Sequence, residues 1–284
     1  MRRAVTISVL CAAVLALGAC KDDEQAAKPI RTYVSMGDSF TSGAGLPQTT
    51  SPVCQRSRLA YPALVAKELG ARLDDASCGG AATVNVAGPQ VIGTETVPPQ
   101  LDAVKPGTDL VTVGLGFNDQ NWFAGFFSGC TALTASDPDG HPCQDLGEAG
   151  NADADVVSET IRKQVVDTLG LIRKKAPDAR ILLVGYPQLV PASGTCAALP
   201  LAKDDYPYVR SMMELLDDKL SDAADAADVT YVDVLGASEG HDICAGDEAW
   251  VNGATTVVGT AAGYHPFARG QRAVADLVLA ALRD

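Results

Sequence analysis

Five short strand-like runs alternate with helical patterns along this chain, an order that few folds can accommodate. Several of the runs are rich in Val, Leu and Ile, as strands buried in a parallel sheet should be. They cover residues 31–36, 72–77, 109–115, 180–186 and 229–234. Helical patterns cover residues 59–69, 156–175, 206–227 and 266–282. The sequence therefore predicts an α/β fold, a three-layer α/β/α sandwich with a five-stranded parallel sheet, in one domain over residues 29–284.

The N-terminal segment has the pattern of an export signal. A cationic start precedes an apolar run over residues 4–17 and two small residues, which is typical of a secretory signal peptide and too short for a confident membrane span. The Leu-Gly-Ala-Cys sequence ending at Cys20 resembles a bacterial lipobox, in which that cysteine would be lipidated. We expect a signal peptide over 1–19, a lipidated tether over 20–28, and anchoring to the outer face of the bacterial cell membrane, or secretion if the lipobox is not used.

The cysteines support an oxidising compartment. Once the signal peptide and the lipidated cysteine are set aside, an even number remains, which predicts disulfides in an exported domain. Six cysteines allow fifteen connectivities. The simplest pairs neighbours in the sequence: Cys54 with Cys78, Cys130 with Cys143, and Cys196 with Cys244. A zinc site is the alternative, but the chain has no Cys-x-x-Cys or Cys-x-x-His spacing to support it.

Charge and composition exclude several classes of protein. The chain carries 22 Lys and Arg against 35 Asp and Glu, without a basic cluster, which argues against a nucleic-acid partner. A hydrophobic content of 47% argues against disorder. Neither a P-loop nor a dinucleotide fingerprint is present. These features leave a folded, extracytoplasmic domain with no nucleotide cofactor.

Four segments with chemical potential follow the predicted strands or open the last helix. Ser39 follows the first strand, on a turn that could present its hydroxyl to a cleft. Gly80 follows the second strand, where glycine leaves a backbone N–H unhindered. Asn118, after the third strand, could donate its side-chain amide to an oxyanion, and His265 could act as a general base. In an open α/β sheet the carboxyl ends of the strands build the site, so the four segments predict one site.

In this order, the segments resemble the SGNH/GDSL hydrolases, a family of esterases and lipases. The matching residues are Gly37-Asp38-Ser39-Phe40, Gly80, Gly116-Phe117-Asn118-Asp119 and His265. The three cysteine pairs and Trp250-Val251-Asn252-Gly253 are similar to the secreted bacterial lipase/esterase branch. The resemblance covers the whole mature chain and implies a flavodoxin-like SGNH hydrolase fold.

The resemblance also implies roles for these residues. Ser39 would be the nucleophile and His265 the base that takes and later returns its proton. The backbone N–H groups of Ser39 and Gly80 and the side-chain amide of Asn118 would form an oxyanion hole. No metal or organic cofactor is implied. The expected partners are a small-molecule or lipid ester and the membrane, and the protein is expected to be a monomer.

One position departs from the family pattern. The family usually has an Asp three residues before the His, to orient the imidazole, and here that position is Ala262. Orienting a tautomer needs an acceptor rather than a charge, so we expect the Ala262 carbonyl to serve. A distant carboxylate such as Asp242 is the second possibility, and a slow or inactive enzyme is the third.

Two further features allow both a functional and a structural interpretation. Trp122, Phe123, Phe126 and their neighbour Phe127 form the densest aromatic cluster, inside a long segment over residues 120–151. They could line a substrate pocket for an acyl chain, or they could be a helix packed on the core. Ser238 lies in a Gly-x-Ser-x-Gly sequence like the elbow of α/β-hydrolases, but no clear helical pattern follows it.

The sequence thus predicts a serine ester hydrolase that works through an acyl-Ser39 intermediate. Two alternatives remain open. One is a carbohydrate O-acetyl esterase or acyltransferase of the cell envelope, and the other is a non-catalytic envelope-binding lipoprotein.

Overall fold

The computed structural model describes residues 28–149 and 153–283. The predicted signal peptide, the lipobox cysteine Cys20 and nearly all of the predicted tether lie outside these residues. Among the helices that the model describes, none is long and apolar enough to cross a bilayer.

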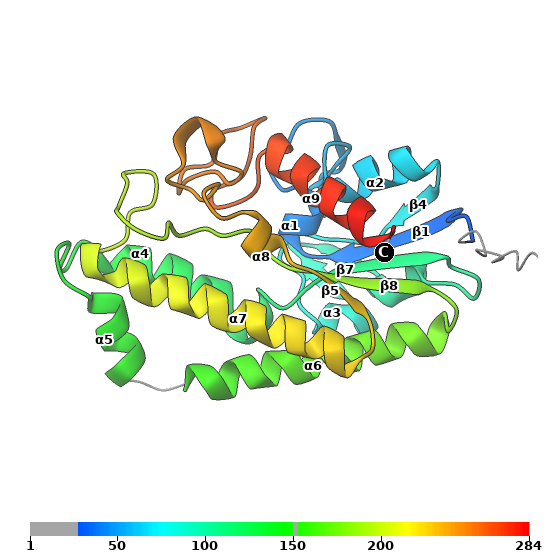
Figure 1. Cartoon of the computed structure of the whole chain (residues 1–284), viewed down its shortest axis with the longest axis horizontal. Helices are drawn as coiled ribbons and strands as arrows, with labels where there is room; N and C mark the ends of the chain where they lie inside the picture. Colours follow the sequence, from blue (N-terminus) through cyan, green and yellow to red (C-terminus); the bar gives the residue numbers. More distant parts are fainter. Residues whose placement is uncertain (1–27, 150–152, 284) are drawn as a thin grey trace, which may run out of the picture.

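A five-stranded parallel sheet forms the centre of the molecule (Figure 1). Its strands are β1 (Thr32–Gly37), β4 (Arg72–Asp75), β7 (Leu110–Gly114), β8 (Arg180–Val184) and β9 (Thr230–Val232). All five predicted strands are therefore present, and the predicted fold class is confirmed. Their order in space is β4-β1-β7-β8-β9. The chain reverses direction across the sheet between β1 and β7, and ligands of open α/β sheets bind at such a switch point.

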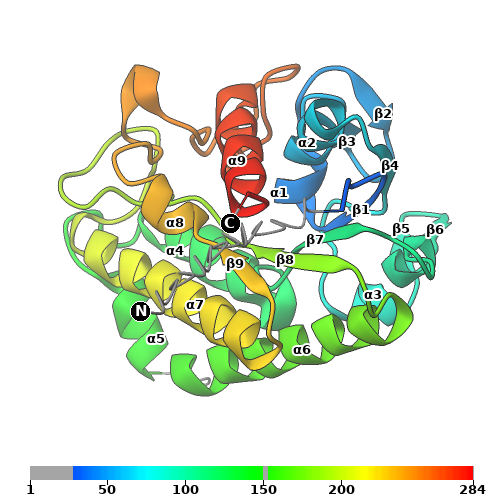
Figure 2. The same cartoon turned by 45° about the vertical axis from the view of Figure 1, so that its right-hand side comes forward.

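Helices cover both faces of this sheet, as Figures 1 and 2 show. The long helices α6 (Ala154–Lys175) and α7 (Tyr206–Ala226) lie on one face, and α2 (Tyr61–Leu69) and α9 (Ala268–Ala281) lie on the other. Successive strand residues point to opposite faces. Tyr33 accordingly packs in the core beneath α2 and α9, whereas its neighbour Val34 packs in the core beneath α6 and α7.

Local signals in the sequence explain where these helices begin and end. The Asp153 side chain accepts a hydrogen bond from the Asp155 backbone N–H and caps α6, which therefore begins two residues before its predicted start. Three basic residues in the last turn of α6 complement its dipole. Helix α2 has Pro62 in its first turn and ends at Gly70 in the left-handed conformation.

Short elements complete the fold. They are α1 (Ser39–Ser42), β2 (Thr49–Ser51), β3 (Arg56–Ser57), α3 (Val84–Ala87), β5 (Gln90–Ile92), β6 (Glu95–Val97), α8 (Val234–Ala237), and 3₁₀ turns at Gln100–Ala103, Lys203–Asp205 and Gly246–Glu248. β2 pairs with β3 and β5 pairs with β6, each as an antiparallel ribbon outside the main sheet.

The described part of the long segment 120–151 is mostly helical. It forms a 3₁₀ turn (Asp119–Asn121), a π-helical turn (Ala124–Ser128), and helices α4 (Gly129–Leu133) and α5 (Pro142–Ala149). The reason lies in its aromatic residues, since Trp122 and Phe127 are both 1% exposed and pack into the hydrophobic core. A segment that buries such side chains must satisfy its own backbone hydrogen bonds, and short helices do so.

All three predicted disulfides are present. Cys54 bonds to Cys78, Cys130 to Cys143 and Cys196 to Cys244. Three bridges in one domain are typical of proteins that leave the cytoplasm for an oxidising compartment. The protein is therefore an exported one.

Candidate active site

The first strand delivers Ser39 to the sheet edge at the switch point. β1 ends at Gly37, and helix α1 begins two residues later at Ser39. The intervening Asp38 caps α1, because its Oδ1 accepts from the Phe40 backbone N–H at 2.9 Å. The Ser39 side chain is thus held at the start of a helix, half-buried, next to helix-type backbone N–H groups.

His265 lies directly against this serine, although 226 positions separate them in the sequence. Its Nε2 is 2.8 Å from Ser39 Oγ, and its Nδ1 is 2.6 Å from the Gly263 carbonyl oxygen. A carbonyl oxygen can only accept, so Nδ1–H is the donor in the neutral ring. Nε2 is then left unprotonated, and it accepts from the Ser39 hydroxyl. This is the tautomer that a general base needs.

The carbonyl that orients His265 is that of Gly263 and not that of Ala262. The Ala262 oxygen is already occupied, since it accepts from the His265 backbone N–H at 3.2 Å and from Asn252 Nδ2 at 3.1 Å. Asp242 does not serve either. Its carboxylate accepts from the Cys244 backbone N–H at 2.7 Å and makes no hydrogen bond to His265 within the described ranges.

Asn252 is a site residue whose role sequence reasoning missed. Its side-chain amide, on a residue that is 7% exposed, donates to the carbonyls of Thr255, Ala261 and Ala262. Its backbone N–H donates to the His265 carbonyl at 3.0 Å. Asn252 therefore fixes both ends of the turn that positions the imidazole. The sequence signal for Asn252 was its place within Trp250-Val251-Asn252-Gly253, but that motif did not show which backbone groups the Asn252 side chain would bind.

Three donors follow the neighbouring strands β1, β4 and β7, at the edge of the sheet where Ser39 lies. In the parts of the chain that the structure describes, the backbone N–H groups of Ser39 and Gly80 have no acceptor. The Asn118 side-chain amide donates to the Ala81 carbonyl at 3.0 Å, which leaves its second N–H free. The structure thus brings together the residues that the sequence predicted for an oxyanion hole. Gly80 has φ of 74°, a conformation that glycine adopts without strain.

The two loops that carry these donors are bound to each other. Asp119, next to Asn118, accepts from the Thr83 backbone N–H at 3.1 Å and from the Thr83 hydroxyl. Asp119 is 4% exposed, and burial raises the pKa of its carboxyl while the Thr83 contacts oppose that rise. Donors held this way need little reorganisation during a reaction.

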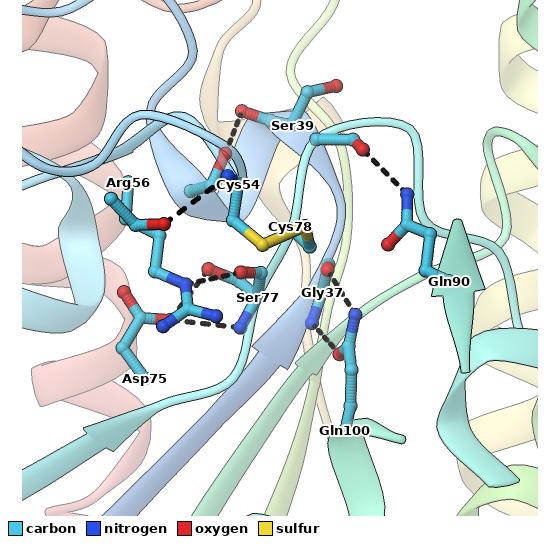
Figure 3. The surroundings of a disulfide bond; sticks show 12 residues. Gly37, Ser39, Cys54, Arg56, Asp75, Ser77, Cys78, Gln90 and Gln100 are labelled. Atoms are coloured by element: carbon cyan, nitrogen blue, oxygen red, sulfur yellow. Dashed lines mark hydrogen bonds between the residues drawn. A yellow bond between two sulfur atoms is a disulfide. The ribbon is translucent and has the colours of Figure 1, made fainter. Parts of the chain in front are cut away.

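A disulfide and two glutamines fix the glycine loop and the end of β1 (Figure 3). Cys78 precedes the glycines, and its partner Cys54 accepts from the Gly79 backbone N–H at 3.0 Å. Gln90 Nε2 donates to the Gly79 carbonyl at 2.8 Å. Gln100 bonds both backbone groups of Gly37, at 2.8 and 2.9 Å. Nothing in the sequence around either glutamine signals these contacts, because Gln90 begins the β5 strand and Gln100 begins a 3₁₀ turn, both outside the predicted site segments.

The aromatic cluster divides between the two interpretations. The Phe123 ring is 6.2 Å from the His265 ring between centroids, so Phe123 lies beside the site. Trp122, expected to line a pocket, is instead 1% exposed in the core, because its side chain points inward from the same turn. The side chain of Phe126 lies outside the described part of the structure. Phe40 was not predicted as a lining residue, and its ring centroid is 4.9 Å from that of His265.

Other sequence candidates are structural. Ser238 is fully buried, donates to the Leu235 carbonyl at 3.0 Å and accepts from the Gln188 backbone N–H at 2.7 Å. The segment 187–205 has no helix or strand before its last three residues, and the Cys196–Cys244 disulfide anchors it.

Besides Asp119, two more groups at the site have shifted pKa values. Burial lowers the pKa of His265, and the Gly263 carbonyl partly opposes that fall, so the imidazole is neutral at physiological pH. Burial raises the pKa of Asp38 to about 7, against the hydrogen bonds that its carboxylate accepts.

Comparison with known proteins gives one consistent family. Residues 35–273 match the GDSL-like Lipase/Acylhydrolase family model. The chain is 36% identical to Lipase 2 of Streptomyces coelicolor over 97% of this chain and 95% of that one. It is 30% identical to a lipase of Streptomyces rimosus over 95% and 94% of the two chains.

Solved structures agree. Phospholipase A1 from Streptomyces albidoflavus superposes with a TM-score of 0.72 at 28% identity, over 89% of this chain and 98% of that one. An extracellular lipase from Streptomyces rimosus gives 0.72 at 27%, over 88% and 99%. The chain therefore belongs to the GDSL-like lipase/acylhydrolase family and is a carboxylic ester hydrolase.

Proposed function

We propose that Ser39 and His265 form a catalytic dyad that hydrolyses lipid esters through an acyl-Ser39 intermediate. The supporting observation is the pair of contacts made by His265, from Nε2 to Ser39 Oγ at 2.8 Å and from Nδ1 to the Gly263 carbonyl at 2.6 Å. A nucleophile bonded to a base, with the base oriented by a third group, is the arrangement that covalent catalysis requires.

The proposed reaction has two halves. Ser39 Oγ attacks the ester carbonyl carbon as its proton passes to His265 Nε2, and the carbonyl oxygen becomes an oxyanion facing the Ser39, Gly80 and Asn118 donors. Collapse of the tetrahedral intermediate breaks the bond to the alcohol, which leaves with the proton from Nε2. Water then attacks the acyl-enzyme with His265 again as base, and the acid is released. Neither half calls for a metal or an organic cofactor.

Substitution of the serine tests this assignment. Ser39→Ala should lower kcat for p-nitrophenyl butyrate by at least about 10³-fold while the protein keeps its fold, because among the described residues the Ser39 hydroxyl is the one nucleophile that contacts His265 Nε2. Ser238→Ala is the matched control, since it removes a serine hydroxyl from the other candidate motif and should leave catalysis close to wild type. Retention of activity in Ser39→Ala would remove Ser39 as nucleophile.

The proposed substrate class comes from the named relatives, which are lipases and a phospholipase A1. An acyl-chain series from acetate to palmitate, run with phosphatidylcholine, tests it. Lipid esters predict that kcat/KM rises beyond acetate. A preference confined to acetyl esters would favour the carbohydrate O-acetyl esterase instead.

We also propose the domain division and location that the sequence suggested. Residues 1–19 are a signal peptide, Cys20 carries lipid at the start of a tether ending at residue 28, and a monomeric hydrolase domain follows on the outer face of the membrane. Expression in a bacterial host fed with labelled palmitate tests the anchor. Wild type should incorporate label and pellet with membranes, whereas Cys20→Ser should do neither.

A further inference from the structure

One tyrosine hydroxyl at the site has no part in the proposed reaction. Tyr186 is 4% exposed and lies two residues after the end of β8, which is the strand next to β7. Its hydroxyl donates to Asp38 Oδ2 at 2.7 Å and accepts from the Phe117 backbone N–H at 3.3 Å. Each of these partners adjoins a residue of the proposed machinery, because Asp38 precedes Ser39 and Phe117 precedes Asn118.

The hydroxyl therefore joins the turn of the nucleophile to the turn of the oxyanion donor. β1 and β7 pair only as far as Gly37 and Gly114, and the last backbone bond between the two turns runs from Asp38 N–H to the Gly114 carbonyl. Beyond that point no backbone hydrogen bond of the described residues joins the segments that follow β1 and β7. The Tyr186 hydroxyl is a link between them after the sheet ladder has ended.

The Tyr186 ring is held in place by its neighbours. It packs edge-on against Phe40 with centroids 5.2 Å apart, and against Phe117 at 4.7 Å. Both partners belong to the turns that the hydroxyl connects. A ring fixed on two sides presents its hydroxyl at a constant position, so the link is preorganised.

We propose that Tyr186 is a positioning residue, whose hydroxyl sets the Ser39 turn relative to the Asn118 donor at the distance that the tetrahedral intermediate needs. The proposal rests on the function proposed above for Ser39 and Asn118. It assigns Tyr186 no contact with substrate.

The charges around Asp38 supply a readout for this role. The Asp38 carboxylate faces the Tyr186 hydroxyl and the Phe40 backbone N–H, and both favour its ionised form. The negative charge of Asp119, in the loop after β7, disfavours that form. Burial raises the pKa of Asp38 to about 7, and the Tyr186 hydrogen bond limits that rise. Without the hydroxyl the pKa of Asp38 must rise further, so at neutral pH the carboxyl is mostly protonated and accepts more weakly from Phe40 N–H.

The test is Tyr186→Phe, which keeps the ring and removes the hydroxyl. We expect kcat for p-nitrophenyl butyrate at pH 7 to fall about 10- to 100-fold with KM within about twofold, because the interaction acts in the transition state. Part of the deficit should remain at pH 9, because the link between the two turns is absent in Tyr186→Phe at every pH, whereas the weakened contact with Phe40 N–H recovers as the Asp38 carboxylate ionises. Tyr33→Phe is the matched control, because that buried hydroxyl is 2.7 Å from Thr112 Oγ1 and serves only the core.

The outcomes separate the two proposals. A kcat unchanged in Tyr186→Phe overturns the positioning role. If Ser39→Ala remains active, the proposed function fails whatever Tyr186→Phe shows. Should Tyr186→Phe fail to fold, Asp38→Ala tests the same link, because it removes the acceptor of the Tyr186 hydroxyl. We expect kcat to fall with KM within about twofold. Wild-type kcat in a folded Asp38→Ala protein would overturn the link.

Discussion

The orientation of His265 depends on a single backbone carbonyl. From the sequence one could predict that an acceptor other than a nearby carboxylate must orient the ring, because Ala262 occupies the family's acidic position. Which carbonyl does so was not predictable. Tyr264 adopts the left-handed conformation, with φ of 62°, which is uncommon for a bulky residue and aims the Gly263 oxygen at Nδ1. Local sequence gives no sign of that turn, which tertiary contacts hold.

A pair of neighbouring substitutions tests the Gly263 assignment. A Cβ on residue 263 would lie 2.4 Å from the Ala254 carbonyl oxygen, so Gly263→Ala must shift the backbone that orients the ring. We expect kcat to fall about 10- to 100-fold with the fold retained. Ala262→Ser leaves that carbonyl in place and should keep kcat within about threefold in steady-state assays. Equal effects of the two changes would contradict the assignment.

Asp38 has a cost in stability that depends on pH. Its pKa is about 7 in the folded protein and near the ordinary aspartate value when unfolded, so between these values the folded state binds the extra proton. Raising pH through this window therefore favours unfolding. Asp38→Asn lacks this titration, so its stability relative to wild type should increase by up to about 4 kcal/mol as the pH rises from 4 to above 7. Urea unfolding from pH 4 to pH 8 checks this, and a gap that does not widen with pH would count against it.

At the scale of elements, the site is the meeting point of segments that different forces position. The central strands β1, β7 and β8 were predictable because parallel strands buried on both faces must be apolar. A helix around positions 122, 123 and 127 was one of the two interpretations of the aromatic cluster, because the spacing of four residues from 123 to 127 fits a helix face. The division of 119–149 into several short helices was not predictable, because it depends on which of these side chains the core takes up. Helix α9, which follows His265, is joined to the nucleophile helix by Gln271, whose Nε2 donates to the Phe40 carbonyl and whose Oε1 accepts from the Tyr61 N–H. Such a link between α1, α2 and α9 is visible only once the fold is known.

Gln271 therefore stabilises three elements at once. Gln271→Met keeps the approximate volume but leaves two buried backbone groups without partners, each costing about 1–3 kcal/mol. We expect the free energy of unfolding in urea to fall by about 2–5 kcal/mol. Gln164→Met, on α6, should change it by less than about 0.5 kcal/mol. Similar values for the two variants would show that the Gln271 contacts contribute little.

At the scale of the whole molecule, cysteine spacing and export were predictable together, since neighbours in the sequence pair with one another. The strand order was implied only by resemblance, because periodicity does not say which strands are adjacent. What the sequence could not show is that the Cys54–Cys78 bond adjoins the glycine loop of the site. That position follows from the parallel pairing of β1 with β4.

Removal of this disulfide should affect both stability and catalysis. Cys54→Ser with Cys78→Ser opens a loop of 24 residues, which costs about 3 kcal/mol on the chain-entropy model. It also loosens the Gly79–Gly80 turn, so we expect a fall of about tenfold in kcat. The matched pair Cys196→Ser with Cys244→Ser should lower stability to a similar degree and leave kcat nearer to wild type. Thermal unfolding and steady-state kinetics distinguish them, and an unchanged kcat in the first pair would contradict this role.

The place of that bond has a consequence for the timing of activity in the producing cell. A newly made chain in a reducing cytoplasm carries Cys54 and Cys78 as thiols, and its glycine loop lacks the covalent anchor seen here. With this arrangement, the oxidation that follows export also anchors the glycine loop of the site, so we expect the newly made chain to reach its full kcat only after it has left the cytoplasm.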